Sequence, residues 1–152
     1  SNNDDKLNNT KEPFSDKSVT TNSIEDLSEK IYLAIKDNKF EDISDFIITT
    51  AEFDEISEDS DAGEKEKIEN LTSRFEKMFQ RIHADLNWKD IKIIDKQCRV
   101  KQIKKISSAG VYTKFINNGK EYILKYKCVL VKRGWVLISP FQVYPSDDNL
   151  NE

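Results

Sequence analysis

The alternation of apolar and polar residues marks the C-terminal part of the chain as antiparallel sheet. Residues 122–130 alternate aromatic and aliphatic side chains with lysines, and residues 111–116 show the same period of two. Between them lies Asn118-Gly119, a pair that tolerates positive φ at both central positions of a tight hairpin turn. The pattern predicts three consecutive antiparallel strands within residues 109–144.

The third of these strands falls in an almost wholly apolar run, residues 135–143. Such a run is typical of a strand that is buried on both faces near the middle of a sheet. Pro140 favours an edge or a bulge instead, because proline cannot donate a ladder hydrogen bond.

Helical periodicity dominates the preceding part of the chain. An apolar stripe predicts a first helix over residues 23–37 that begins at Ser23, and a shorter helix follows around residues 40–47. Residues 48–53 are ambiguous between a strand and a helix end, and the acidic residues 52–66 are interpreted as a solvated loop. A second long stripe predicts a helix over residues 64–86.

After this helix, residues 91–106 alternate irregularly and predict a further strand. The predicted fold is therefore α+β, with two short helices and one long helix packed on a curved four-stranded antiparallel sheet. The chain has 152 residues, which suits one domain. We place that domain at residues 23–145, after a polar tail at 1–22 and before a flexible end at 146–152.

The composition excludes several classes of protein. No apolar run approaches the roughly 20 residues that span a bilayer, and no cofactor motif or zinc-binding spacing occurs. Cys98 and Cys128 fall on different predicted strands, so they form either a disulfide between adjacent strands or two unpaired core thiols. The first residue is Ser1, which fits a processed or a trimmed chain; with the polar tail, it favours an exported, lipid-anchored protein over a cytoplasmic one.

Two segments resemble nuclear transport factor 2-like domains, within the cystatin-like α+β superfamily. Residues 34–42 (AIKDNKFED) are similar to the helix, polar turn and second helix that open many of these domains. Residues 132–137 (KRGWVL) are similar to the Gly-Trp final strand of small exported bacterial members. The resemblance implies a cone whose curved sheet wraps the long helix around a pocket. Enzymes of the family commonly place an Asp or His in that pocket, but no catalytic residue of this chain aligns with one.

Candidate binding residues are mostly aromatic. A pocket for an apolar or ring-shaped ligand would be lined by side chains of the long helix and the sheet, although aromatic residues at such positions also serve as core. The candidates are Phe79, His83, Trp88, Tyr112, Phe115, Tyr126 and Trp135. His83 is the only histidine, and Asp85, two residues away on a helix, does not face it.

Charge divides sharply along the chain. Residues 23–87 hold 8 Lys/Arg against 18 Asp/Glu, a net charge of −10, whereas residues 88–144 hold 13 Lys/Arg against 3 Asp/Glu, a net charge of +10. One interpretation is attraction between the helical layer and the sheet. The other is a basic sheet face that points away from the helices and meets an anionic partner. The strand cations that predict this face are Arg99, Lys101, Lys114, Lys125 and Lys127.

These observations predict a non-catalytic binding or interaction domain. Its partner would be a small apolar ligand, an acidic protein or an anionic surface, and exposed apolar residues on the basic face also allow a homodimer through the sheet. Sequence-specific nucleic-acid binding is not expected, because no recognition motif is present. The alternatives are a small dehydratase- or isomerase-like enzyme of the same fold, with His83 or a pocket carboxylate as base, and an immunity-type protein whose acidic helices meet a basic partner.

Overall fold

The first half of the chain folds into helices, as its 3.6-residue periodicity predicts. The computed structural model describes residues 23–57 and 62–146. Its helices are α1 (Ile24–Asp37), α2 (Glu41–Ser44), α3 (Thr50–Ile56), α4 (Ala62–Glu69) and α5 (Leu71–Asp85), followed by the 3-10 turn η1 (Trp88–Asp90). Ser23 caps α1, because its side chain accepts a hydrogen bond of 3.1 Å from the backbone N–H of Asp26.

The acidic segment differs from the prediction. Much of residues 52–66, interpreted as a loop, is helical in α3 and α4, and the predicted long helix over 64–86 is divided at Asn70 into α4 and α5. The start of α3 is fixed by a capping box: Glu52 N–H donates to Thr49 Oγ1 over 3.1 Å, and Thr49 N–H donates to Glu52 Oε1 over 3.0 Å. Local capping, rather than an apolar stripe, therefore defines this helix.

The second half of the chain forms one antiparallel sheet of five strands. These are β1 (Lys92–Ile103), β2 (Ile106–Asn117), β3 (Lys120–Val131), β4 (Gly134–Leu137) and β5 (Gln142–Pro145). The predicted strand over 91–106 ends at Ile103, where Lys104, with φ of 58°, turns the chain into β2. The predicted Asn-Gly hairpin turn is confirmed, since Asn118 and Gly119 have φ of 53° and 77°.

The apolar run after β3 is not a central strand. It divides into β4 and β5, which pair with opposite halves of β3. Pro140 lies in the break, where a missing backbone N–H is tolerated. The side chain of Ser139 compensates for part of the lost ladder, because its Oγ accepts a hydrogen bond of 3.0 Å from Lys127 N–H.

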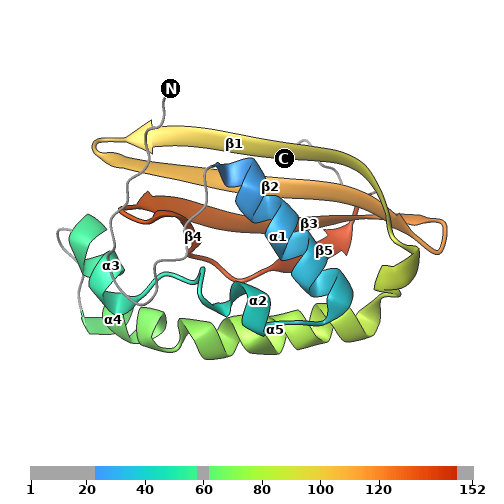
Figure 1. The fold of residues 1–152 in the computed structure, drawn as a ribbon, viewed down its shortest axis with the longest axis horizontal. Helices are drawn as coiled ribbons and strands as arrows, with labels where there is room; N and C mark the ends of the chain where they lie inside the picture. Colours follow the sequence, from blue (N-terminus) through green and yellow to red (C-terminus); the bar gives the residue numbers. More distant parts are fainter. Residues whose placement is uncertain (1–22, 58–61, 147–152) are drawn as a thin grey trace, which may run out of the picture.

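Helices cover the sheet unevenly (Figure 1). Helix α1 crosses one face of the sheet, whereas α5 runs beside the edge that carries β4 and β5. The ring of Phe75 on α5 meets the ring of Phe141 at 5.1 Å, and Phe79 meets Phe40 at 5.4 Å. The fold is α+β as predicted, but a nuclear transport factor 2-like cone, with the sheet wrapped around the long helix, is not confirmed.

Three further observations bear on the predictions. Both cysteines are free: Cys98 on β1 and Cys128 on β3 are separated by β2. Within residues 23–57 and 62–146, no helix has the length and apolar character needed to cross a membrane. The predicted tail at 1–22 and most of the predicted flexible end, residues 147–152, lie outside the described residues.

Candidate anion-binding site

Strand register separates the two faces of the sheet. On the front face, Lys96 of β1 donates a hydrogen bond of 3.0 Å to Ser28 of α1, so this face meets the helices. On the back face, Arg99 lies opposite Gly110 and Gly110 opposite Lys127, while Tyr112 lies opposite Lys125. Alternation places the five predicted strand cations together on the back face. We call this set the basic face: Arg99, Lys101, Lys114, Lys125 and Lys127.

An aromatic ring organises the centre of the basic face. A Cβ atom at Gly110 would lie 3.2 Å from Cε1 of Tyr112, so the tyrosine ring covers the position where glycine has no side chain. The Arg99 guanidinium carbon lies 4.5 Å from the centroid of this ring, and Lys125 Nζ lies 5.6 Å from it. Cation–π attraction, about 0.5–1 kcal/mol at exposed sites, holds the two cations beside each other.

The cations of the basic face differ in their hydrogen-bond and ion-pair partners. Gln97 orients Arg99, because its Oε1 accepts hydrogen bonds of 3.2 Å and 2.9 Å from Nε and Nη2 of the guanidinium. Lys114 is partly neutralised by Glu121, whose carboxylate lies 3.7 Å from Nζ. Within the described part of the chain, Lys101 and Lys127 have no ion-pair partner. Positive charge is therefore concentrated away from Glu121, around Arg99, Lys125 and Lys127.

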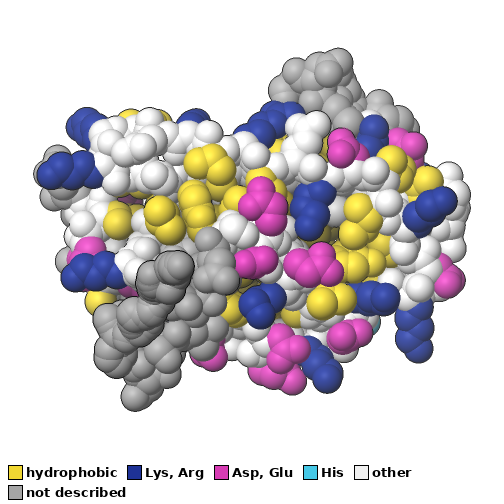
Figure 2. Space-filling model, turned by 45° about the horizontal axis from the view of Figure 1, so that its top comes forward, with side chains coloured by type: hydrophobic (Ala, Val, Ile, Leu, Met, Phe, Trp, Pro, Cys, Tyr) yellow, Lys and Arg dark blue, Asp and Glu magenta, His cyan; other side chains and the backbone are white. Residues whose placement is uncertain are grey.

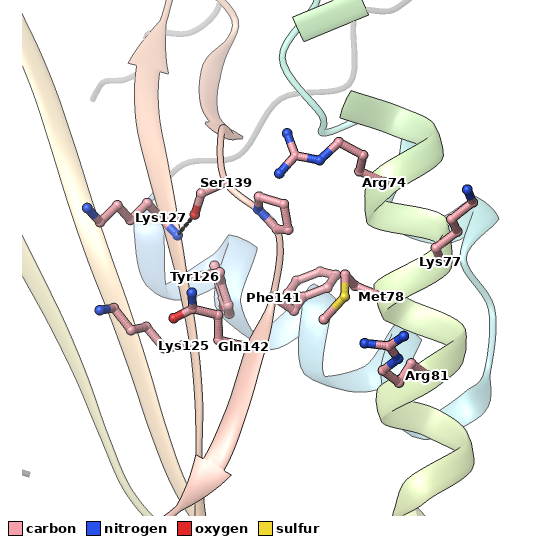
Figure 3. A pocket seen from close by; sticks show the side chains of 11 residues that line it. Arg74, Lys77, Met78, Arg81, Lys125, Tyr126, Lys127, Ser139, Phe141 and Gln142 are labelled. Carbon is pink, nitrogen blue, oxygen red and sulfur yellow. Dashed lines mark hydrogen bonds between the residues drawn. The ribbon is translucent and has the colours of Figure 1, made fainter. Parts of the chain in front are cut away.

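A cleft of about 560 Å³ adjoins this face, and we call it the basic cleft. It lies between α5, β3 and the connection from β4 to β5 (Figure 3). Its lining residues are Arg74, Lys77, Met78, Arg81, Lys125, Tyr126, Lys127, Ser139, Pro140, Phe141 and Gln142. Arg74 and Arg81 reach from α5 toward the connection, whereas Lys77 points away from it, and Lys125 and Lys127 extend from β3 in the direction away from α5.

The basic cleft is unusual in its charge. Five of its lining side chains are cationic and none is acidic. Over residues 23–57 and 62–146, none of these five forms an ion pair. Three of them, Arg74, Lys77 and Arg81, come from the half of the chain whose net charge is −10. Uncompensated like charges that border one concave surface raise the positive potential there, which attracts anions.

A larger groove of about 1040 Å³ continues from the basic cleft, since Lys125 and Lys127 line both. Its cationic side carries Arg99, Lys101, Lys104 and Lys105, and Phe53 and Ile56 of α3 add apolar surface. Glu55 and Glu64 also line this groove. Its lining therefore contains both acidic and basic side chains, whereas that of the basic cleft contains no acidic one. The α5 end therefore has the more uniformly cationic lining.

The predicted pocket residues do not converge on one cavity. Phe79, Trp88 and Phe115 are buried in the core, where Trp88 donates a hydrogen bond of 2.8 Å to the carbonyl of Ile82. Tyr112 lines the larger groove from the back face. Tyr126 lines the basic cleft but is 2% exposed, and burial raises its pKa, so its phenol stays protonated at neutral pH.

The remaining two candidates lie elsewhere. Trp135 is half-buried at the start of β4, packed against the core. His83 is half-buried on the last turn of α5, and it lines neither the basic cleft nor the larger groove. In the described residues, His83 forms no ion pair with a carboxylate that would make an acid–base dyad. Nor does any cluster of three His, Cys, Asp or Glu side chains there have the arrangement of a metal site.

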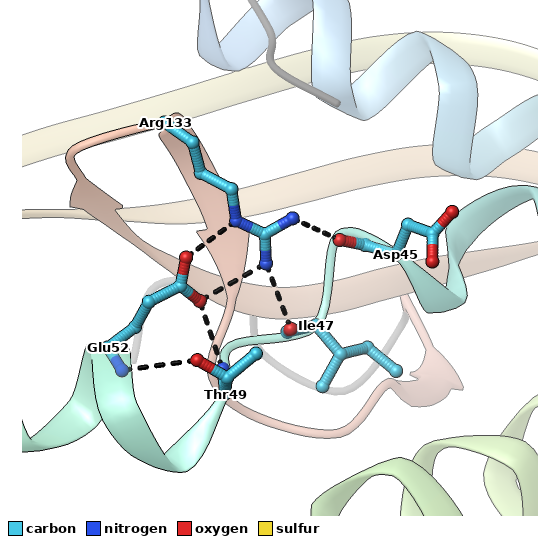
Figure 4. Close-up of polar contacts among 5 residues, drawn as sticks. All are labelled: Asp45, Ile47, Thr49, Glu52 and Arg133. Carbon is cyan, nitrogen blue, oxygen red and sulfur yellow. Dashed lines mark hydrogen bonds and ion pairs between the residues drawn. The ribbon is translucent and has the colours of Figure 1, made fainter. Parts of the chain in front are cut away.

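One polar site, formed by Arg133 and Glu52, was not predicted from the sequence. The guanidinium of Arg133, only 8% exposed, donates hydrogen bonds to both carboxylate oxygens of Glu52, at 2.6 Å and 3.1 Å, and to the carbonyls of Asp45 and Ile47 (Figure 4). Burial alone would raise the pKa of Glu52, but hydrogen bonds from Arg133 and Thr49 outweigh it and lower the pKa. All of its partners are protein groups, so this pair joins α3 to the β3–β4 turn.

Charge is mixed on the side of the molecule that Figure 2 shows. Figure 2 shows the side that carries α1 and β1, where apolar side chains surface between acidic and basic ones.

Comparison with known proteins adds no functional information, because no family model, no curated protein and no solved structure matches this chain.

Proposed function

We propose that this chain is a non-catalytic binding module that holds an anionic partner against the basic face and the basic cleft. The observation that carries the proposal is the cleft itself, whose lining contains cations of α5 and β3 and no acidic side chain. Attraction between the acidic and basic halves of the chain does not explain this lining, because Arg74, Lys77 and Arg81 belong to the acidic half.

The arrangement favours binding over catalysis. Arginine and lysine side chains supply fixed positive charge, and the groups that line the cleft include no carboxylate or imidazole to act as a general base near neutral pH. An enzyme that uses His83 would need the substrate to reach the end of α5, away from the lining of both grooves. Membership of the nuclear transport factor 2-like group and export from the cell remain predictions that this proposal does not require.

The test uses retention on a sulfopropyl cation-exchange resin at pH 7 and low salt. The whole chain has a net charge of −4, so retention would show that a local basic surface binds the resin. We expect the wild type to be retained and to elute as salt rises above about 0.1 M, where the Debye length is about 10 Å. The variant Lys125→Glu/Lys127→Glu should pass through the column.

The matched control is Lys30→Glu/Lys39→Glu, which changes the net charge equally at exposed positions that line neither groove. It should be retained like the wild type. If the control passes through as well, or if the wild type is never retained, charge on the back of the molecule does not act as a binding surface and the proposal is wrong.

A further inference from the structure

We infer that the basic cleft is a site for a linear anion built of phosphate groups, an inference that rests on the proposed function. Two rows of cations border the cleft. On α5, Arg74 and Arg81 reach toward the β4–β5 connection, whereas Lys77 points away from it (Figure 3). On β3, Lys125 and Lys127 point to the same face of the sheet.

The length of these rows indicates an extended ligand. Arg74 and Arg81 are seven residues apart, which corresponds to roughly 10 Å along a helix. A single phosphate or carboxylate does not fill such a row, whereas a chain of linked phosphates brings several charges along it. Arginine adds a preference for phosphate, because its planar guanidinium donates paired hydrogen bonds to two oxygens of one group.

The uncharged part of the lining also suits phosphate oxygens. Ser139 Oγ accepts the hydrogen bond of Lys127 N–H, and the hydroxyl proton of Ser139 has no acceptor in the described residues. That O–H is a free donor within the cleft. Phe141, which is fully buried, and half-buried Met78 and Pro140 form the apolar part of the lining. Apolar surroundings lower the local dielectric constant and strengthen the attraction between the cations and a bound anion.

The ligand could be a free polyphosphate-type anion or a lipid headgroup with more than one phosphate, since both present the same chemistry. The probe for the first is sodium tripolyphosphate, titrated into the wild-type protein by isothermal calorimetry at low salt. The probe for the second is sedimentation with phosphatidylcholine vesicles, prepared with and without cardiolipin. Saturable binding in either arm supports the inference and identifies the source.

Two variants localise the binding. Arg74→Gln/Arg81→Gln removes two exposed cations that line only the basic cleft, and we expect it to weaken tripolyphosphate binding at least roughly tenfold. Lys30→Gln/Lys39→Gln removes the same charge at exposed positions that line neither groove, and it should change the affinity by less than about threefold. Circular dichroism melting of both variants checks that the fold is intact.

Three results would overturn the inference. One is equal weakening by both variants, which would reflect net charge alone. Another is binding of poly-glutamate as tight as that of tripolyphosphate, which would assign the cleft to an acidic protein. The third is no binding in either arm. If resin retention persists in that last case, the proposed function stands and only the phosphate assignment fails; if retention is also absent, both fail.

Discussion

At the scale of single residues, the Arg133–Glu52 pair joins segments that are distant in the sequence. The pair lies 81 positions apart in the chain and is largely shielded from water, so removing one partner leaves the other charge partly buried and uncompensated. The capping-box pattern Thr49-x-x-Glu52 could have signalled the start of α3. Nothing in the sequence around the turn at Arg133 indicates its partner, because the contact depends on how the β3–β4 turn meets α3.

We expect Arg133→Met to cost about 3 kcal/mol of unfolding free energy at pH 7, the lower end for a broken buried pair, since Glu52 keeps some exposure. The cost should depend on pH. In the wild type the pKa of Glu52 is lowered, so its stabilising contribution is present above the ordinary glutamate pKa of about 4.3 and is lost as pH falls through the lowered value.

Urea unfolding of both proteins near pH 7 and near pH 3 would measure this dependence. The difference between wild type and variant should shrink at the lower pH, because Glu52 is then largely protonated in the variant and its pairing with Arg133 is weakening in the wild type. A difference that stays constant across this range would mean that the lost hydrogen bonds to the Asp45 and Ile47 carbonyls, rather than the ion pair, account for the cost.

At the scale of elements, α5 is positioned by its buried face, which includes the ring contacts of Phe75 and Phe79. Phe79→Ala should lower the unfolding free energy by about 3–5 kcal/mol, the usual loss for a buried aromatic side chain, because Phe79 is 1% exposed and packs on Phe40. Gln80→Ala, exposed on the same helix, is the control and should stay within about 0.5 kcal/mol. Similar denaturation midpoints for the two variants would contradict this placement of α5.

The elements also show which parts of the fold the sequence could predict. Periodicity identified α1, most of α5 and the β2–β3 hairpin, because these segments have one buried face and clear ends. It failed for α3 and for the break between α4 and α5: no residue of α3 is buried, and the start of α3 is fixed by a cap and by Arg133. It also joined β4 to β5, because the composition of the run does not show which half of β3 each part pairs with.

The sequence likewise predicts only part of the candidate site. The basic face follows from a period of two within β1 and β3 and from a tight turn that fixes the register of β2 on β3. The basic cleft does not, because packing between elements far apart in the sequence, such as the contact of Phe75 with Phe141, places Arg74 and Arg81 beside the β4–β5 connection. Long-range packing of this kind leaves no periodic trace in a single sequence.

At the scale of the whole molecule, the division of charge bears on self-association. Among the described residues, six large apolar side chains are exposed, and four of them lie on β1: Ile93, Ile94, Val100 and Ile103. This strand is an edge of the sheet, a position from which chains can pair with each other. However, β1 also carries Arg99 and Lys101, and a contact between two back faces would oppose one basic face to another.

We therefore expect a monomer at low salt, even though the apolar residues of β1 are available. Raising the salt to about 1 M shortens the Debye length to about 3 Å, so repulsion weakens and association through β1 should increase. Light scattering coupled to size exclusion would measure this change. Arg99→Gln/Lys101→Gln should dimerise at lower salt than the wild type, whereas Lys30→Gln/Lys39→Gln should not. A dimer that forms at low salt and dissociates as salt rises would contradict the expectation, because ionic contact between the acidic half of one molecule and the basic half of another would then control assembly.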